Sequence, residues 1–258
     1  MEPIHTQQNE SKSEGSETSA VETKVKKDIN YVLPAAILIA SVLISGSILY
    51  SRGAPLAAGA GGAAVASKSV EKLKAVGDDD YIRGNRDADV IIVEFSDPEC
   101  PFCKVFHETM QKLVQEYGES GKFAWVYRHY PLDSLHKNAR TESEAMECAG
   151  LVGGNDAFWR FTDEVFSRTN SNDSLDLNEL PKIAAQVGLD QGAWNRCVVN
   201  RESKEEVDAD TANAIDSGAR GTPYSVLINT KTGEKTVIAG AEPYQSVKEK
   251  IESALSGR

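Results

Sequence analysis

The stretch VIIVEFSDPECPFC, residues 90–103, decides the fold because it joins an apolar run to two cysteines that are separated by two residues. The run Val90–Phe95 is apolar except for Glu94, which is typical of a strand that is buried on both faces of a sheet. Pro101 favours the start of a helix after Cys100, since a proline at the first helical position loses no hydrogen bond. The sequence therefore predicts a strand that delivers Cys100 to the N-terminus of a helix.

The spacing of Cys100 and Cys103 predicts a dithiol redox site. Two intervening residues make one helical turn, which brings the two sulfurs close enough to form a disulfide. The unpaired N–H groups and the positive dipole end of the helix favour the thiolate, which is the form that attacks disulfides. A zinc knuckle and a pair of core thiols are alternative interpretations of C-x-x-C, but the strand and helix around it favour redox chemistry.

The rest of the chain after residue 103 predicts alternating elements. Apolar residues at helical spacing predict a helix over 101–117, and the aromatic run KFAWVYRHY predicts a strand over 122–130. Strand, helix and strand in this order form a βαβ unit with parallel strands. A helical region over 135–219 follows, in the pieces 137–151, 157–167, 179–187, 191–200 and 202–217. An antiparallel hairpin of strands 223–229 and 235–239 and a closing helix over 244–255 complete the pattern.

The N-terminal part predicts a membrane anchor. Residues 1–30 are polar and cannot bury a core, so we expect a disordered tail. Residues 31–50 carry no charge over 20 positions, long enough for a hydrocarbon core of about 30 Å. Lys24, Lys26 and Lys27 precede this span and only Arg52 follows it closely, which predicts a cytoplasmic N-terminus and an extracytoplasmic domain on a single-pass protein of the cell membrane. A signal peptide cleaved near residues 64–66 is the alternative.

Charge and cysteine content narrow the function further. We expect an Ala/Gly-rich linker over 51–78 and a single domain over 79–258. The net charge of −11 argues against a nucleic-acid binder, because an acidic chain repels the phosphate backbone. The four cysteines all follow the predicted span, and their even number is typical of two disulfides in an oxidising compartment.

The order βαβ, helical insert, ββα resembles the thioredoxin fold, and the size of the insert resembles the DsbA-type thiol oxidoreductases of bacterial envelopes. The resemblance rests on CPFC after a strand and on Gly221-Thr222-Pro223 before another, and it covers nearly all of residues 80–258. It implies an α/β, thioredoxin-like fold with an inserted helical subdomain, here preceded by one transmembrane helix.

The resemblance also implies roles for individual residues. Cys100 would be the exposed nucleophile and Cys103 the buried resolving partner. Pro223 would be a cis-proline facing the dithiol, which leaves the Thr222 backbone to pair with an extended substrate. An ordinary trans-proline at a strand edge is the alternative.

Pro101 and Phe102, between the cysteines, are expected to tune the thiolate and to contact substrate. By resemblance, strongly oxidising members of the family carry a histidine in the Phe102 position. Phenylalanine supplies no charge and no conventional donor, so we expect a reactive thiolate with a less extreme redox potential.

Glu94 is the single charged residue of its predicted strand. By resemblance it would be a buried carboxylate beneath the disulfide, with a raised pKa, able to accept the proton of Cys103. The alternative is an exposed position on the edge of the sheet.

Cys148 and Cys197 both fall in predicted helices of the insert, which favours a structural disulfide between them. Buried free thiols and a second redox pair are alternatives, whereas a four-cysteine zinc site normally draws on closely spaced pairs. His107, four residues after Cys103, is expected to be a core or partly exposed histidine rather than part of the site.

These observations predict an envelope protein thiol–disulfide oxidoreductase that introduces disulfides into exported proteins without a cofactor or metal. The alternatives are a reductase or isomerase of the same fold, a non-catalytic thioredoxin-like binding module, and a secreted zinc-binding domain. The expected partners are unfolded or reduced exported proteins and, by resemblance, a quinone-linked membrane protein that reoxidises the dithiol. The direction of electron flow through Cys100 is not decided by the sequence.

Overall fold

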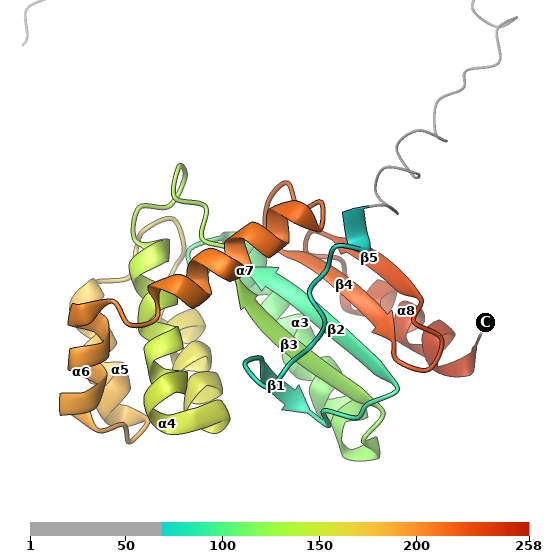
Figure 1. Cartoon of the computed structure of the whole chain (residues 1–258), viewed down its shortest axis with the longest axis horizontal. Helices are drawn as coiled ribbons and strands as arrows, with labels where there is room; N and C mark the ends of the chain where they lie inside the picture. Colours follow the sequence, from blue (N-terminus) through green and yellow to red (C-terminus); the bar gives the residue numbers. More distant parts are fainter. Residues whose placement is uncertain (1–68, 258) are drawn as a thin grey trace, which may run out of the picture. The chain divides into compact units, whose positions relative to one another are not determined.

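The computed structural model describes residues 69–257, and within them a mixed five-stranded sheet is flanked by helices (Figure 1). The strands are β1 (Tyr81–Gly84), β2 (Val90–Ser96), β3 (Phe123–His129), β4 (Tyr224–Asn229) and β5 (Lys235–Ala239). The α-helices are α3 (Pro101–Tyr117), α4 (Ala139–Arg168), α5 (Leu180–Gln186), α6 (Gln191–Asn200), α7 (Lys204–Asp216) and α8 (Tyr244–Ser256). Short 3-10 turns cover Gly118–Ser120 and Leu177–Glu179.

The sheet has the strand order β1-β3-β2-β4-β5. Strands β2 and β3 are parallel and connected by α3, which confirms the predicted βαβ unit. Strands β4 and β5 form the predicted antiparallel hairpin, and β4 pairs antiparallel with β2. Every residue of β2 is buried because the strand has a neighbour on each side and a helical layer on each face.

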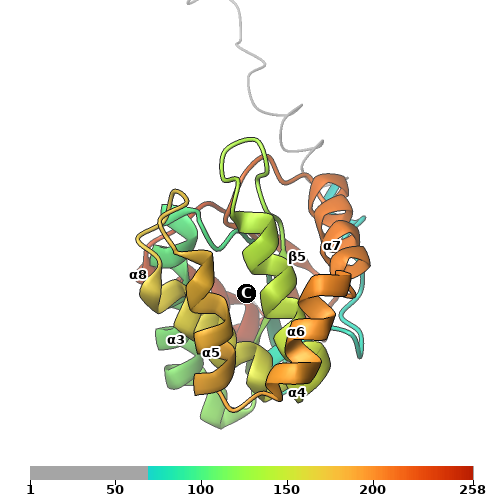
Figure 2. The same ribbon diagram turned by 90° about the vertical axis from the view of Figure 1, so that its left-hand side faces the viewer.

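Helices cover both faces of the sheet. Figure 2 shows α3 and α8 on one side and α7 on the other. Val90 and Ile92 of β2 belong to the apolar core that also contains Phe106 of α3 and Ile251 of α8. The alternate residues of β2 point to a second apolar cluster, which contains Ala214 of α7. Glu94, two residues after Ile92, therefore faces the α3 side, because side chains alternate along a strand.

The helical insert lies between β3 and β4, as predicted. Helices α4, α5 and α6 form a group beside the sheet, and α7 runs back over it (Figure 1). The first two predicted helices are joined in α4, which has a kink at Gly154 (φ 75°, ψ −173°). This backbone conformation is accessible to glycine and strained for other residues, so the predicted break at Gly153-Gly154 is present as a kink rather than as a loop.

Strand β1 is absent from the sequence-based prediction. The four residues of β1 include few apolar side chains, and they are too few to show the alternating pattern by which a strand is recognised in a sequence. The structure pairs β1 antiparallel with β3, at one edge of the sheet. The side chain of Asn155 covers that edge: Ile82 N–H donates to Oδ1 (2.8 Å) and Nδ2 donates to the Ile82 carbonyl oxygen (2.9 Å). This amide occupies backbone groups that would otherwise be open to another strand.

The packed domain begins before residue 79. Val70 and Leu73, which fall in the predicted 51–78 linker, are buried against the α7 side of the sheet. The predicted tail, the predicted span over 31–50 and the rest of the linker up to residue 68 lie outside the described residues. Within residues 69–257, no helix combines the length and the hydropathy that crossing a membrane requires.

Candidate active site

The two cysteines of CPFC lie where β2 ends and α3 begins. Cys100 is the N-cap residue of α3, with an extended backbone (φ −78°, ψ 122°), and Pro101 is the first helical residue. The Cys100 N–H donates to the Asp97 carbonyl oxygen over 3.1 Å, which fixes the turn between strand and helix. Cys100 is only 5% exposed and Cys103 is fully buried. Cys100 is therefore the more accessible sulfur, although it is less exposed than the resemblance implies.

Cys100 and Cys103 are both free thiols, and their surroundings shift their pKa values in opposite directions. The Cys103 side chain, the Thr222 side chain and backbone N–H groups of α3 lower the pKa of Cys100 to about 6, although burial opposes them. Burial raises the pKa of Cys103 well above its usual value, and a negative charge on Cys100 raises it further. The thiolate consequently forms at Cys100, the position that an incoming disulfide can reach.

The Thr222–Pro223 peptide bond is cis and lies against the dithiol. The Cys100 thiol donates to the Thr222 carbonyl oxygen over a distance of 3.4 Å. Thr222 and Pro223 also line a surface hollow, which they share with Gly218, Arg220, Gly221, Tyr224, Ala239 and Gly240. The fold thus brings together the two motifs that carry the resemblance.

Phe102 is 64% exposed, which places its ring on the surface beside Cys100. Val105, one helical turn later on α3, is 58% exposed. Pro101 is exposed as well. The first turn of α3 therefore presents an apolar surface to any chain that approaches the Cys100 sulfur.

Glu94 is fully buried in the middle of β2, so the alternative of an exposed sheet edge does not hold. Neither of its carboxyl oxygens has a hydrogen-bond partner among the described residues. Burial raises the pKa of Glu94 to about 8, although the nearby side chains of Ser96 and Trp125 favour the ionised carboxylate and oppose this shift. A carboxyl group with this pKa can both accept and release a proton near neutral pH.

A second buried acid, Asp97, contacts both cysteines through its backbone, and its side chain pairs with His136. The Asp97 N–H donates to the Cys103 sulfur (3.4 Å), and its carboxylate lies 2.9 Å from Nδ1 of His136. Burial lowers the pKa of His136, but the Asp97 carboxylate and the negative charge of Cys100 outweigh burial, and the net shift is upward. Sequence reasoning missed this pair because 39 residues separate its members.

Glu99, directly before Cys100, ties the motif to a loop of the insert. Its buried carboxylate accepts hydrogen bonds from the backbone N–H groups of Asp173 (2.6 Å) and Ser174 (3.3 Å) and from the Thr169 hydroxyl (3.1 Å). Burial and the neighbouring Glu99 raise the pKa of Glu142 to about 10, so Glu142 is protonated at neutral pH. These contacts hold the turn before Cys100 in place, and nothing in the local sequence marks Glu99 for this role.

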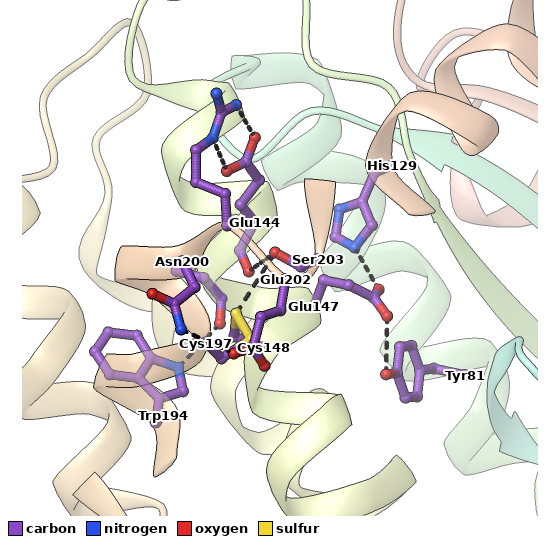
Figure 3. Close-up of a disulfide and its surroundings, with 12 residues drawn as sticks. Tyr81, His129, Glu144, Glu147, Cys148, Trp194, Cys197, Asn200, Glu202 and Ser203 are labelled. Atoms are coloured by element: carbon purple, nitrogen blue, oxygen red, sulfur yellow. Dashed lines mark hydrogen bonds and ion pairs between the residues drawn. A yellow bond between two sulfur atoms is a disulfide. The ribbon is translucent and has the colours of Figure 1, made fainter. Parts of the chain in front are cut away.

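Cys148 of α4 and Cys197 of α6 form a disulfide with a Cα–Cα distance of 5.8 Å (Figure 3). Both residues are at most 2% exposed. The Trp194 indole N–H beside the bridge donates to the Ala145 carbonyl oxygen over 3.1 Å. The bridge thus fastens α6 to α4 inside the insert.

His107 is part of the core. It is 3% exposed, lies 2.8 Å from the Asp163 carboxylate and stacks on Phe166. Burial lowers its pKa, although Asp163 opposes that effect. In residues 69–257 no cluster of three or more His, Cys, Asp or Glu side chains could hold a metal ion.

Solved structures with a similar fold include thiol-disulfide proteins of bacteria. DsbA2 of Pseudomonas aeruginosa is 27% identical with a TM-score of 0.57, and the match covers 68% of this chain and 94% of that one. BdbD from Bacillus subtilis is 21% identical with a TM-score of 0.61, covering 69% and 94%. The thiol-disulfide exchange protein alpha-DsbA2 from Wolbachia pipientis is 18% identical with a TM-score of 0.59, covering 74% and 97%. At 21% and 18% identity, the second and third structures show a shared fold, whereas the 27% identical DsbA2 supports an oxidoreductase of the same general kind.

Curated relatives match over a shorter part of their length. The Na(+)/H(+) antiporter NhaA 1 of Mycolicibacterium gilvum is 31% identical over 149 residues, which are 56% of this chain and 23% of that protein. The NhaA antiporter of Herminiimonas arsenicoxydans is 33% identical over 144 residues, or 56% of this chain and 21% of that protein. The chain spans less than a quarter of the length of these antiporters, and their transport activity is not assigned to it.

The thioredoxin family model matches residues 77–252, which include β1 to β5, the CPFC motif, the insert and the cis-proline. This range is more than half of the chain and coincides with the fold described above. The chain therefore belongs to the thioredoxin family.

Proposed function

We propose that this protein is an envelope thiol–disulfide oxidoreductase that introduces disulfides into exported proteins through Cys100 and Cys103. The observation that carries the proposal is the pairing of a Cys100 thiol of low pKa with a buried Cys103 thiol of high pKa beside the Thr222 carbonyl oxygen. A dithiol whose outer sulfur ionises readily is suited to exchange with other disulfides.

The proposed reaction starts from the oxidised form with a Cys100–Cys103 bond. A substrate thiolate attacks the Cys100 sulfur, which forms a mixed disulfide and releases Cys103 as a thiolate. Cys103 then takes the proton of Glu94, whose carboxyl group has a pKa of about 8. A second substrate thiolate attacks the first substrate sulfur and releases Cys100. The substrate gains one disulfide and loses two electrons, and the two cysteines receive them as a dithiol.

Oxidation is the favoured direction because the low pKa of Cys100 stabilises the reduced form. Phe102 supplies no charge to the thiolate, so we expect a potential between those of the strongest oxidants and thioredoxin. A reductase or isomerase on the same scaffold is the alternative.

The surface around the site supports unfolded, reduced proteins as the proposed substrate class. Exposed Phe102 and Val105 offer apolar contacts, and the hollow at Pro223 leaves room for an extended chain. Apolar contacts and backbone pairing do not depend on a particular sequence, which suits unfolded, reduced proteins as substrates. A quinone-linked membrane protein is the proposed reoxidant.

The proposed location is the outer face of the cell membrane, with residues 31–50 as an uncleaved anchor. The charge asymmetry around that span supports this orientation. The Cys148–Cys197 disulfide supports an oxidising compartment. Proteolysis of intact cells should therefore remove the domain and leave residues 1–30 protected, whereas recovery of a soluble protein starting near Ser67 would favour a cleaved signal peptide.

The function is tested by mixing the oxidised full-length protein with a reduced, unfolded protein and counting the thiols lost. We expect one substrate disulfide per oxidised molecule, and none with Cys100→Ser. Equilibration with glutathione decides the direction: about −120 to −180 mV indicates an oxidant or isomerase, and about −270 mV a reductase. A Cys100→Ser variant that retains the full effect on its substrate would instead identify a non-catalytic binding module.

A further inference from the structure

Several polar side chains without partners gather beneath the buried sulfur of Cys103. Each is at most 2% exposed, and each has side-chain polar atoms that lack a hydrogen-bond partner among the described residues. They come from the three central strands of the sheet and are called the polar cluster below. Its members are Glu94, Ser96, Trp125, Tyr127 and Ser225.

Strand pairing places these side chains on one face of the sheet. Tyr127 of β3 and Ser225 of β4 are both directly opposite Glu94, one on each side. Ser96 lies two residues after Glu94 on the same strand and so points to the same face. Trp125, two residues before Tyr127, belongs to the apolar core on the α3 side.

The polar cluster reaches the reacting sulfur. The residue after Ser96 is Asp97, whose N–H donates to the Cys103 sulfur over 3.4 Å. Burial raises the pKa of Cys103, whereas the Ser96 hydroxyl acts in the opposite direction and favours the thiolate. Burial also raises the pKa of Tyr127, and negative charges on Cys103 and Glu94 raise it further. The two hydroxyl groups therefore respond to the charge that appears during exchange.

A buried donor without an acceptor destabilises a protein, because it gives up hydrogen bonds to water and gains none in return. The polar cluster therefore destabilises the folded protein as long as the Cys103 thiol and the Glu94 carboxyl group are uncharged. This destabilisation becomes smaller when a proton leaves Cys103 or Glu94, because a fixed donor then faces a negative charge at low dielectric.

We propose that Ser96 and Tyr127 are positioning residues for the proton transfer between Cys103 and Glu94, and that their hydroxyl groups stabilise the negative charge on either side of that transfer. The inference rests on the proposed thiol–disulfide exchange and deepens it. In the transfer, the S–H bond of Cys103 breaks and an O–H bond forms on Glu94. The reverse transfer accompanies release of Cys103 from its disulfide, so the role is the same in both directions of exchange.

The test is the reaction of the reduced full-length protein with 5,5′-dithiobis(2-nitrobenzoate) in a stopped-flow instrument. Cys100 thiolate releases one thionitrobenzoate and forms a mixed disulfide. Cys103 then loses its proton, attacks the Cys100 sulfur and releases the second. The two absorbance phases report the two cysteines separately, and their pH profiles report the two ionisations.

Ser96→Ala and Tyr127→Phe are expected to leave the first phase unchanged and to slow the second by at least about tenfold each. The pH at which the second phase is half-maximal should rise by about one. The stability to urea should stay equal or increase, since each change removes an unpartnered buried hydroxyl. A merely structural role predicts the reverse, with lower stability and both phases affected together.

Two control variants carry matched changes elsewhere. Thr162→Val removes another buried hydroxyl without a partner among the described residues, on α4, and Tyr117→Phe removes a tyrosine hydroxyl at the far end of α3. Both should leave both phases and the pH profile unchanged. A Ser96→Ala/Tyr127→Phe double variant with a wild-type second phase would overturn the inference. Absence of a second, Cys103-dependent phase in the wild type would overturn the proposed function instead.

Discussion

The sulfur of Cys100 lies 3.4 Å from the carbonyl oxygen of Thr222, although 122 residues separate them in the chain. One belongs to the N-terminus of α3 and the other to the loop before β4. The contact exists because β2 and β4 are antiparallel neighbours in the sheet, which brings the segment after β2 beside the segment before β4.

The low pKa of Cys100 makes the stability of the dithiol form depend on pH. Its folded pKa of about 6 is below the value of about 8.5 expected in an unfolded chain, so ionisation stabilises the folded form. This contribution is fully present above about pH 8.5 and is lost as the pH falls through about 6. Urea unfolding of the reduced protein and of Cys100→Ser between pH 5 and pH 9 (roughly the window of these pKa values) measures it. A difference between the two proteins that stays constant with pH would contradict this assignment.

Glu94→Gln is expected to stabilise the protein at alkaline pH and to impair exchange. The folded pKa of Glu94 is raised to about 8, so its contribution is fully present below about pH 4.3 and is lost as the pH rises through about 8. At pH 8 the variant should be more stable than the wild type by roughly 4–5 kcal/mol, with little difference near pH 4. The attack of Cys103 should be slower in the variant. If the difference in urea midpoint between the variant and the wild type were the same at pH 4 and pH 8, Glu94 would not be a buried carboxyl group that ionises in this range.

Phe102→His tests the influence of the residue between the cysteines. The side chain is 64% exposed, so the change should not disturb the core. A cationic imidazole near the sulfur is expected to lower the pKa of Cys100 below 6 and to make the protein more oxidising, by about 30 mV for each tenfold change in the equilibrium constant. Thiolate absorbance and glutathione equilibrium measure the two effects. Phe102→Leu is the matched control and should change neither.

His136→Asn is expected to raise the pKa of Cys100 and to destabilise the protein. The variant leaves the buried Asp97 carboxylate without its cationic partner, which costs roughly 3–5 kcal/mol. The pKa of His136 is raised, so its contribution is fully present below about pH 6.5 and is lost as the pH rises beyond that value. The double variant Asp97→Asn/His136→Asn should recover part of the stability, and a strictly additive double-mutant cycle would contradict the pairing.

Replacing both Cys148 and Cys197 by alanine should remove about 4 kcal/mol of stability, since the bridge joins residues 49 positions apart. The rate at which Cys100 reacts should not change, because the bridge lies within the insert. Thermal unfolding and thiolate reactivity measure the two quantities. Altered reactivity of Cys100 together with preserved stability would point to the alternative of a second redox pair.

Local patterns were sufficient for much of the fold. The apolar run of β2, the helical spacing of α3 and the turn between β4 and β5 are short-range features, and the predicted bounds are within one or two residues of those observed. By contrast, β1 was missed because its four residues are stabilised by pairing with β3 and by Asn155 rather than by their own sequence. The joining of two predicted helices in α4 likewise depends on packing around Gly154.

The sequence alone determined which residues could carry redox chemistry: two cysteines at helical spacing after a buried strand, and a proline before a later one. Tertiary structure alone decided how these residues act. It placed Thr222 against Cys100, buried Glu94 without a partner, and joined Asp97 to His136 across 39 residues. The reason is physical, because a pKa depends on burial and on charges within a few ångströms, and both are set by which strands are neighbours. CPFC thus identifies a dithiol and, through the N-terminus of α3, favours the thiolate at Cys100, whereas the fold around it buries Cys103 and Glu94 and raises their pKa values.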